Sequence, residues 1–294
     1  MNKANEISAK TRLFDFFRFF FRFPFIERLL IRLKSKSDSF AKLVPNYYQY
    51  KPKTFREFIR SGINYRVDIA DWLGYCAYFN IKNDPYDSLF SLVKPGMIVF
   101  DIGSNIGFTA LNIAALVGEG GMVYAFEPDA YNYTFLKNNV ELNKKLHVKT
   151  FQLGVGNYAE KLKLITHNES NRGENKISSS VTSDNYIVVD IIRLDDFMTE
   201  KNISHADIIK IDTEGFEMNV LKGAKKIIEG CKPILFIEIN DENLKEQKSS
   251  AKDIIAYIIS IGYQITSAQT SEIVSVASDF TNCHFDAVCR SVKE

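Results

Sequence analysis

The sequence is poor in cysteine and histidine, with four of each among 294 residues. The cysteines show no CxxC spacing and no paired histidines accompany them, so a zinc site is not expected. Four cysteines in a chain of this length are also too sparse for a disulfide-stapled secreted domain. We therefore expect unpaired thiols in a reducing cytosol.

The sequence also lacks a long uninterrupted hydrophobic run. Its most aromatic stretch, Phe14–Phe25, holds eight phenylalanines but is broken by charged residues such as Arg18 and Arg22. A membrane span needs about 20 apolar residues. The stretch follows a polar leader and has no small-residue cleavage site, so it does not resemble a signal peptide. We expect a cytoplasmic protein.

The chain as a whole has no large net charge, but its two parts carry net charges of opposite sign. The composition is ordinary for a globular protein, 46% hydrophobic and 25% charged, and the net charge is only +1. Residues 1–53 contain 12 Lys/Arg against 4 Asp/Glu, a net charge of +8, which leaves −7 for the remainder. The acidic remainder disfavours nucleic acid as a partner.

Residues 1–60 are predicted to be a helical extension rich in Phe and Arg. A helix is expected to begin near Pro24, with an apolar face made of Ile26, Leu29, Leu30 and Leu33. Basic charge beside an aromatic face is typical of a helix lying on anionic lipid, so residues 11–36 are a candidate for peripheral membrane contact. The alternative is a helix pair packed on the main domain or on a second subunit of a homo-oligomer.

Residues 61–294 are predicted to be the main domain, because apolar runs alternate there with amphipathic segments. Seven runs are predicted strands: 97–100, 122–126, 148–153, 208–211, 233–239, 263–266 and 285–290. Helices are expected at 106–116, 129–142, 216–229 and 253–260. Asp129 is the expected N-cap of the second of these helices. This alternation predicts an α/β fold with a doubly wound, mostly parallel seven-stranded sheet.

Two segments depart from the alternation. The aromatic segment 65–86 is predicted to form short strands or a hairpin. Residues 158–200 are predicted to be an insertion, with strands at 161–166 and 186–192 around a polar loop at 168–185. We expect this insertion to help shape the acceptor site.

The loop after the first strand of the sheet is a candidate ligand site. Ligands of doubly wound sheets bind outside the carboxyl ends of the strands, and here Val99–Gly107 reads VFDIGSNIG. Its GxxxG pattern lacks the GxGxxG of dinucleotide sites and the GxxxxGK[ST] of nucleotide triphosphate sites. Asp101 would repel phosphates and attract a cationic group such as a sulfonium.

The second strand ends in Glu127, where an acid is placed to accept the hydroxyls of a ribose. Together the two strand ends favour a ligand with a ribose, a positive charge and no phosphate. S-adenosylmethionine meets all three conditions. The alternative is that Asp101 and Glu127 merely cap helices or turns.

With these motifs in place, the sequence resembles the FkbM family of methyltransferases, a branch of the class I S-adenosylmethionine-dependent fold. The resemblance covers about 74–241, and it rests on five segments in the family's order: VFDIGSNIG, YAFEPD, IRLDDF, IIKIDTEGFEMNVLKG and KPILFIE. Ser104 stands where the family usually has Ala, and Thr213 where it often has Val. Both changes are small.

The resemblance implies where S-adenosylmethionine would bind. Residues of the first loop would line its methionine part: Asp101, Gly103, Ser104, Asn105 and Gly107. Glu127, followed by Pro128, would hold the ribose. Asn157, after the third strand, is a weaker candidate for the adenine.

The resemblance also implies methyl transfer to a hydroxyl of a sugar, glycan or related small molecule. Asp212, at the end of the fourth strand, is the candidate base or substrate-orienting group, supported by Glu214 and Glu238. Acids at a helix start also stabilise the helix dipole, which is the other interpretation of Glu214. A further alternative is Mg²⁺ bound by Asp212, Glu238 and Asn240.

The sequence after the fourth strand disfavours an amine of a nucleobase as the methyl acceptor. The site after the fourth strand reads DTEG instead of the [DN]PP[YF] common in enzymes that methylate nucleobase amines. His205 is expected at the far end of its strand, and His147, His167 and His284 at the surface or in loops. Two functional alternatives remain: methylation of a protein or another small metabolite, and a catalytically silent membrane-associated scaffold.

Overall fold

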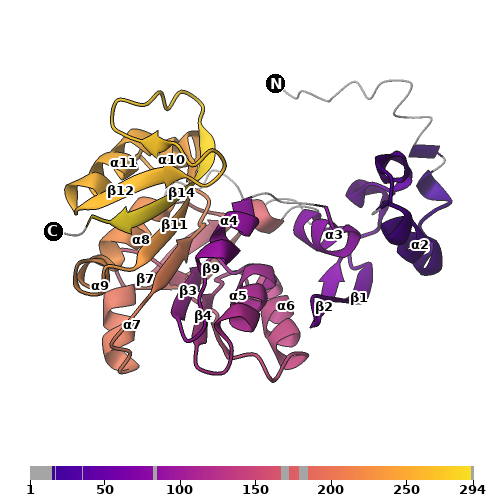
Figure 1. Ribbon diagram of the computed structural model, residues 1–294, viewed down its shortest axis with the longest axis horizontal. Coiled ribbons are helices and arrows are strands. Elements are labelled where there is room, and N and C mark those ends of the chain that lie inside the picture. The colour runs from indigo at the N-terminus through magenta and orange to yellow at the C-terminus, as the bar shows by residue number, and fades with distance from the viewer. Residues whose placement is uncertain are drawn as a thin grey trace. The chain divides into compact units, whose positions relative to one another are not determined.

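The computed structural model describes residues 15, 16, 18–34, 36–81, 85–166, 172–178 and 185–292 (Figure 1). The described residues divide into two compact units. One comprises the chain up to Phe58 together with the segment from Arg66 to residue 81. The other comprises Ile59–Tyr65 and the described residues from 85 onward.

The first unit is built from short elements around one buried ion pair. Its elements are α2 (Pro24–Lys34), η1 (Asp38–Leu43), η2 (Tyr47–Gln49), most of the hairpin β1 (Phe55–Arg60) and β2 (Ile63–Asp68), and α3 (Trp72–Phe79). The carboxylate of Glu27 on α2 is fully buried and binds Arg56 of β1, with Nε 2.7 Å from Oε2. Two hydrogen bonds and an ion pair therefore fasten α2 to the hairpin.

The prediction of strands or a hairpin over 65–86 was wrong beyond β2. A helix, α3, follows instead, because Asp71 accepts hydrogen bonds from the backbone N–H groups of Leu73 and Gly74 as its N-cap. A further helix, α4 (Pro85–Leu92), comes next and belongs to the second unit. Of the aromatic residues in this segment, Tyr75, Tyr78 and Phe79 are buried side chains of α3, whereas Trp72 at its start is 42% exposed.

The second unit contains the predicted doubly wound sheet, which is thereby confirmed. Its order is β13-β12-β14-β11-β10-β3-β4-β5. The strands are β3 (Ile98–Ile102), β4 (Met122–Phe126), β5 (Val148–Phe151), β10 (Ile208–Ile211), β11 (Ile234–Asn240), β12 (Tyr263–Ser267), β13 (Ile273–Val274) and β14 (His284–Ser291). The seven predicted strands are all present, and the two-residue β13 adds an eighth at the edge. Five are parallel, whereas β14 runs antiparallel to β11 and to β12.

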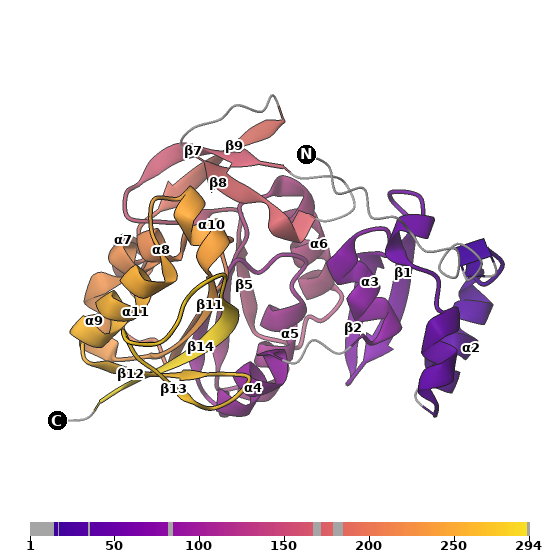
Figure 2. The same ribbon diagram turned by 90° about the horizontal axis from the view of Figure 1, so that it is seen from above.

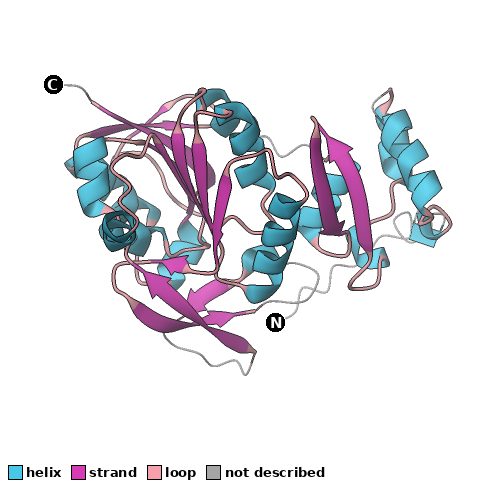
Figure 3. Ribbon diagram, turned by 90° about the horizontal axis from the view of Figure 1, so that it is seen from below, coloured by secondary structure: helices cyan, strands magenta, loops and turns pink. Residues whose placement is uncertain are grey.

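Helices cover both faces of this sheet (Figures 2 and 3). One face packs against α7 (Leu194–Glu200), α8 (Glu217–Gly223), α9 (Lys225–Cys231) and α11 (Ala251–Ser260). The other packs against α4, α5 (Phe108–Val117) and α6 (Ala130–Glu141). As predicted, Asp129 caps α6 by accepting a hydrogen bond from the N–H of Tyr131. The two apolar cores hold the strand ends in fixed positions.

The insertion forms a second, four-stranded sheet in the order β6-β9-β7-β8 (Figure 2). Its strands are β6 (Gly154–Val155), β7 (Glu160–Ile165), β8 (Lys176–Ser178) and β9 (Tyr186–Ile192). The two strands expected at 161–166 and 186–192 are thus confirmed. Most of the predicted polar loop, and His167, lie outside the described residues.

Two expectations from composition meet the structure here. The four cysteines all lie in the described part of the chain and are free thiols, as expected. Among the described residues, no helix combines the length and the apolar character needed to cross a bilayer.

Candidate active site

One edge of the main sheet gathers the residues with the most chemistry. The parallel strands β3, β10 and β11 all end there, which places Asp101, Asp212 and Glu238 at or near their carboxyl ends. Strand β14 runs the other way, so its first residues reach the same edge: Asp286 pairs with Glu238 in the ladder and His284 with Asn240. The sequence prediction considered only where strands end and therefore missed His284.

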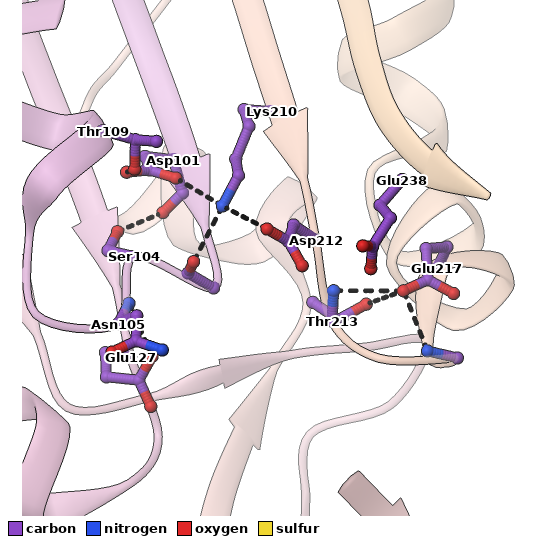
Figure 4. Close-up of polar contacts among 12 residues, drawn as sticks. Asp101, Ser104, Asn105, Thr109, Glu127, Lys210, Asp212, Thr213, Glu217 and Glu238 are labelled. Carbon is purple, nitrogen blue, oxygen red and sulfur yellow. Dashed lines mark hydrogen bonds and ion pairs between the residues drawn. The ribbon is translucent and has the colours of Figure 1, made fainter. Parts of the chain in front are cut away.

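Lys210 of β10 holds the centre of this edge together, and sequence reasoning missed it as well. Its side chain is 2% exposed, and Nζ lies 3.2 Å from Oδ1 of Asp101 and 3.2 Å from Oδ2 of Asp212. Nζ also donates to the carbonyl oxygen of Gly103 at 2.8 Å (Figure 4). Burial alone would lower the pKa of Lys210, but Asp101 and Asp212 outweigh burial and raise it.

Asp101 stabilises the loop after β3 through hydrogen bonds and an ion pair. This carboxylate is fully buried and accepts a hydrogen bond from Thr109 Oγ1 at 2.6 Å in addition to its ion pair with Lys210. Ser104 Oγ donates to the backbone carbonyl of Asp101 at 2.8 Å. Asp101 and Ser104, both predicted to contact the cofactor, thus also set the shape of the loop.

The two glycines of the loop are required by its backbone. Gly103 has a φ of +79°, and a Cβ there would come within 1.8 Å of the carbonyl oxygen of Asp212. Gly107, with a φ of +87°, precedes α5 and leaves room for Leu136, whose Cδ1 would lie 2.7 Å from an added Cβ. The GxxxG pattern is therefore explained by close packing of the loop against β10 and α6.

Glu127 lies at the end of β4 as predicted, with a buried carboxyl group. Its oxygens accept hydrogen bonds from the backbone N–H groups of Asn105 (2.8 Å) and Asp129 (2.9 Å), the latter just beyond Pro128. Burial is the largest cause that raises the pKa of Glu127, to about 8. Beside it, Oδ1 of Asn105 is buried without a hydrogen-bond partner among the described residues.

These two groups fit a ribose-bearing ligand. Each carboxylate oxygen can accept a second hydrogen bond, and the Asn105 oxygen lacks a donor altogether. Asn157, the weaker candidate, follows β6, and its backbone carbonyl accepts a hydrogen bond from Arg193. The prediction for its side chain stays a prediction.

Three carboxylates meet beyond Lys210. One oxygen each from Asp212, Glu214 and Glu238 lies within 4.8 Å of the other two. Burial is the main cause that raises the pKa of Glu214 to about 9, and its acidic neighbours add to it. Burial and then Asp212 raise the pKa of Glu238 to about 7. The sequence prediction thus named three acids that the fold brings together.

One carboxylate oxygen of Glu238 has a hydrogen-bond partner, and the other has none among the described residues. Its Oε1 lies 2.9 Å from Nε2 of His284, whose ring is 60% exposed. Its Oε2 is buried and has no hydrogen-bond partner among the described residues. A buried acceptor without a donor is costly, so this oxygen is suited to a hydroxyl group of a ligand.

Glu214 and Glu217 separate the two roles that the sequence left open. Glu217 is 1% exposed, and its Oε1 accepts three hydrogen bonds, from N and Oγ1 of Thr213 and from N of Gly215. It therefore builds the turn before α8. Glu214 instead has a positive φ of 54° and accepts from Asn243 Nδ2 at 2.6 Å, which turns it toward the carboxylate cluster.

The set of residues that could bind a metal differs from the predicted one. Asn240 caps α10 (Asp241–Glu246) by accepting from the N–H of Asn243, so it is used within the fold. The three carboxylates are near enough to share a divalent cation, but Lys210 already balances Asp212. Magnesium binding at this site therefore stays an alternative.

Comparison with known proteins identifies the family. The chain matches the methyltransferase FkbM domain over residues 101–265, which is more than half of its length. The chain belongs to the FkbM methyltransferase family. The family resemblance read from the strand-end motifs is thereby confirmed.

Curated relatives are more distant. Methyltransferase 1 of Beauveria bassiana (strain ARSEF 2860) is 28% identical over 143 residues, which is 42% of this chain and 57% of the relative. The chain thus spans less than two thirds of the length of that relative. Methyltransferase sdnD of Sordaria araneosa is 28% identical over 192 residues, covering 52% of this chain and 73% of the relative.

A solved structure of the family is also similar to this FkbM chain. The methyltransferase FkbM from Methylobacillus flagellatus KT has 20% sequence identity and a TM-score of 0.47. The match covers 72% of this chain and 50% of the chain in that structure.

Proposed function

We propose that this chain is an S-adenosylmethionine-dependent O-methyltransferase that acts on a hydroxyl of a sugar, glycan or related small molecule. The observation that carries the proposal is Glu238. One oxygen of its carboxylate is oriented by His284, and the other is buried without a partner next to Asp212. Such a carboxylate is positioned to accept the hydrogen of an acceptor hydroxyl.

Glu127 and Asn105 would hold the ribose of S-adenosylmethionine, and the backbone of the glycine loop would lie along its methionine part. When bound, this cofactor supplies a methyl group activated by a sulfonium. The acidic edge favours a sulfonium over a phosphate-bearing cofactor. The chain itself contributes orientation and exclusion of water, which dominate the rate of an in-line displacement.

Glu238 is a better base than Asp212 in this geometry. The ammonium of Lys210 already stabilises the charge of Asp212, whereas a carboxylate with a pKa near 7 matches the pH at which a general base works best. The proton of the acceptor hydroxyl would go to Glu238, which His284 orients, and would then exchange with solvent. Asp212 orients the acceptor, and Glu214 stays protonated.

Calorimetric titration with S-adenosylmethionine tests the first half of the proposal, since folded chain that fails to bind it would exclude the enzyme. Labelled cofactor with a panel of sugars, small metabolites and peptides then tests the acceptor class. Transfer to peptides or to non-hydroxyl groups would contradict the proposed class, and cofactor binding without transfer to any acceptor would favour a silent scaffold.

A further inference from the structure

A patch of exposed aromatic side chains lies on the first unit, outside the residues that match the family. Six apolar side chains of this patch, here called the aromatic face, are each more than half exposed: Phe16, Phe19, Phe20, Phe23, Phe25 and Leu29. The rings make contacts in two groups: Phe20 with Phe16 and Phe19, at centroid distances of 5.4 and 5.8 Å, and Phe23 with Phe25, at 6.3 Å. Large exposed apolar patches on a protein mark surfaces that bind a partner or a membrane.

The aromatic face is not the side by which α2 packs on its own unit. The inner side of α2 carries Glu27, fully buried in its ion pair with Arg56, and Leu30, which is 4% exposed. Leu29 was predicted to share one apolar face with Leu30, but it is 52% exposed and points away from it. The helix therefore already has its packing partner, and the aromatic face remains beyond it.

Basic side chains are interleaved with this face. A pocket on α2 is lined by Phe25 and Leu29 together with Pro24, Arg28 and Arg32. The guanidinium of Arg22 lies 3.8 Å from the centroid of the Phe19 ring. Guanidinium and aromatic groups side by side can engage a phosphate and an acyl chain at once.

Two acidic side chains of this unit are paired with arginines. Asp15 pairs with Arg18 at 2.9 Å, and Glu27 is buried against Arg56. Residues 1–53 as a whole carry a net charge of +8. The surface is complementary to a negatively charged and partly apolar one.

We propose that the aromatic face, with Arg28 and Arg32, binds the surface of a membrane that contains anionic phospholipids. The rings enter the boundary between headgroups and acyl chains, and the two arginines contact lipid phosphates. The net charge of +8 over residues 1–53, together with exposed rings beside Arg28 and Arg32, favours an anionic lipid surface over a neutral apolar partner.

The test is co-sedimentation of the full chain with vesicles of phosphatidylcholine, with and without phosphatidylglycerol. We expect binding to the anionic vesicles only, weakened by added salt because exposed charges are screened. Each basic residue near an anionic surface contributes roughly fivefold to binding, so R28Q/R32Q should bind about 25-fold more weakly. The control K161Q/K201Q removes two exposed lysines of the second unit and should bind like the parent.

A second pair of variants tests the rings. F20S/F25S should lose binding, whereas Y158S, which removes a 65% exposed ring in the second unit, should not. Calorimetric titration with S-adenosylmethionine shows that each variant is folded. Equal binding to neutral and anionic vesicles, equal losses in the control variants, or no binding by folded chain would overturn the proposal. So would a dimer that dissociates in F20S/F25S while no vesicles are bound.

Discussion

The sharpest prediction concerns the pH dependence of turnover and the pair formed by Glu238 and His284. If Glu238 is the base, turnover rises with pH as its carboxyl group loses a proton, with a midpoint near its pKa of about 7. His284 lowers that pKa through its hydrogen bond, while burial and Asp212 raise it. His284→Ala removes the lowering contribution, so the midpoint must move to higher pH.

The size of the shift follows from the contact. A hydrogen bond to a charged group is worth about 1.5–3 kcal/mol, but His284 is 60% exposed and solvent screens it. About 1.4 kcal/mol is therefore a fair expectation, which corresponds to a shift of about one pH unit. Turnover on the acidic limb should fall about tenfold, while the alkaline plateau stays where it is.

The measurement is a pH–rate profile of kcat with labelled S-adenosylmethionine. His205→Ala is a matched control, because His205 Nε2 also lies 2.9 Å from a carboxylate, that of Asp207, at the opposite end of the sheet. Glu238→Gln should abolish the acidic limb and most of the activity. If the His284→Ala profile superimposes on that of the parent, or if Glu238→Gln stays fully active, the assignment of the base is wrong.

Further predictions follow from the same edge. Lys210→Met leaves the buried carboxylate of Asp101 and the partly buried one of Asp212 without their cation. It should cost about 3–5 kcal/mol in the free energy of unfolding by urea, with partial recovery in D101N/K210M. The free energy of unfolding should fall as pH rises from 4.5 toward 9, because folded Glu214 keeps a proton that the unfolded chain releases. Glu214→Gln should flatten that slope by up to about 1.4 kcal/mol per pH unit, and an unchanged slope would contradict the raised pKa. Treatment with EDTA should leave turnover unaltered because Lys210 and bound protons neutralise the cluster, and recovery by Mg²⁺ alone would instead reveal a metal site. In calorimetry above pH 8, where Glu127 with its pKa of about 8 is ionised, Glu127→Gln should weaken S-adenosylmethionine binding about tenfold, the order expected for one hydrogen bond to a charged group. Undiminished affinity would remove Glu127 from the site.

The strands and three of the site's acids were predictable because a parallel sheet has simple rules. Apolar runs become strands, and their last residues share one edge, so Asp101, Asp212 and Glu238 could be grouped without coordinates. His284 escaped because β14 is antiparallel to β11 and presents its first residue, not its last, at that edge. Nothing in the local sequence states the direction of β14, which lies between β12 and β11.

Lys210 escaped for a different reason, although the sequence held a signal. The segment Ile208–Ile211 reads IIKI, and all four residues are buried in a central parallel strand. Burying the charge of a lysine there costs free energy unless carboxylates pair with it. Strand β3 supplies Asp101 on one side, and Asp212 follows directly along the chain. A buried lysine within a central strand therefore predicts carboxylates at its neighbours.

This lysine also explains how one edge tolerates so many acids. Asp101, Asp212, Glu214 and Glu238 would repel one another if all were ionised, and the single ammonium of Lys210 contacts only Asp101 and Asp212. The remaining pair must hold protons, which is what the raised pKa values of Glu214 and Glu238 express. Because the pKa of Glu238 lies near 7, its proton is released close to neutral pH, while that of Glu214 stays. Under the proposed mechanism, Glu238 is therefore the carboxylate that accepts the hydroxyl proton, and His284 holds its other oxygen.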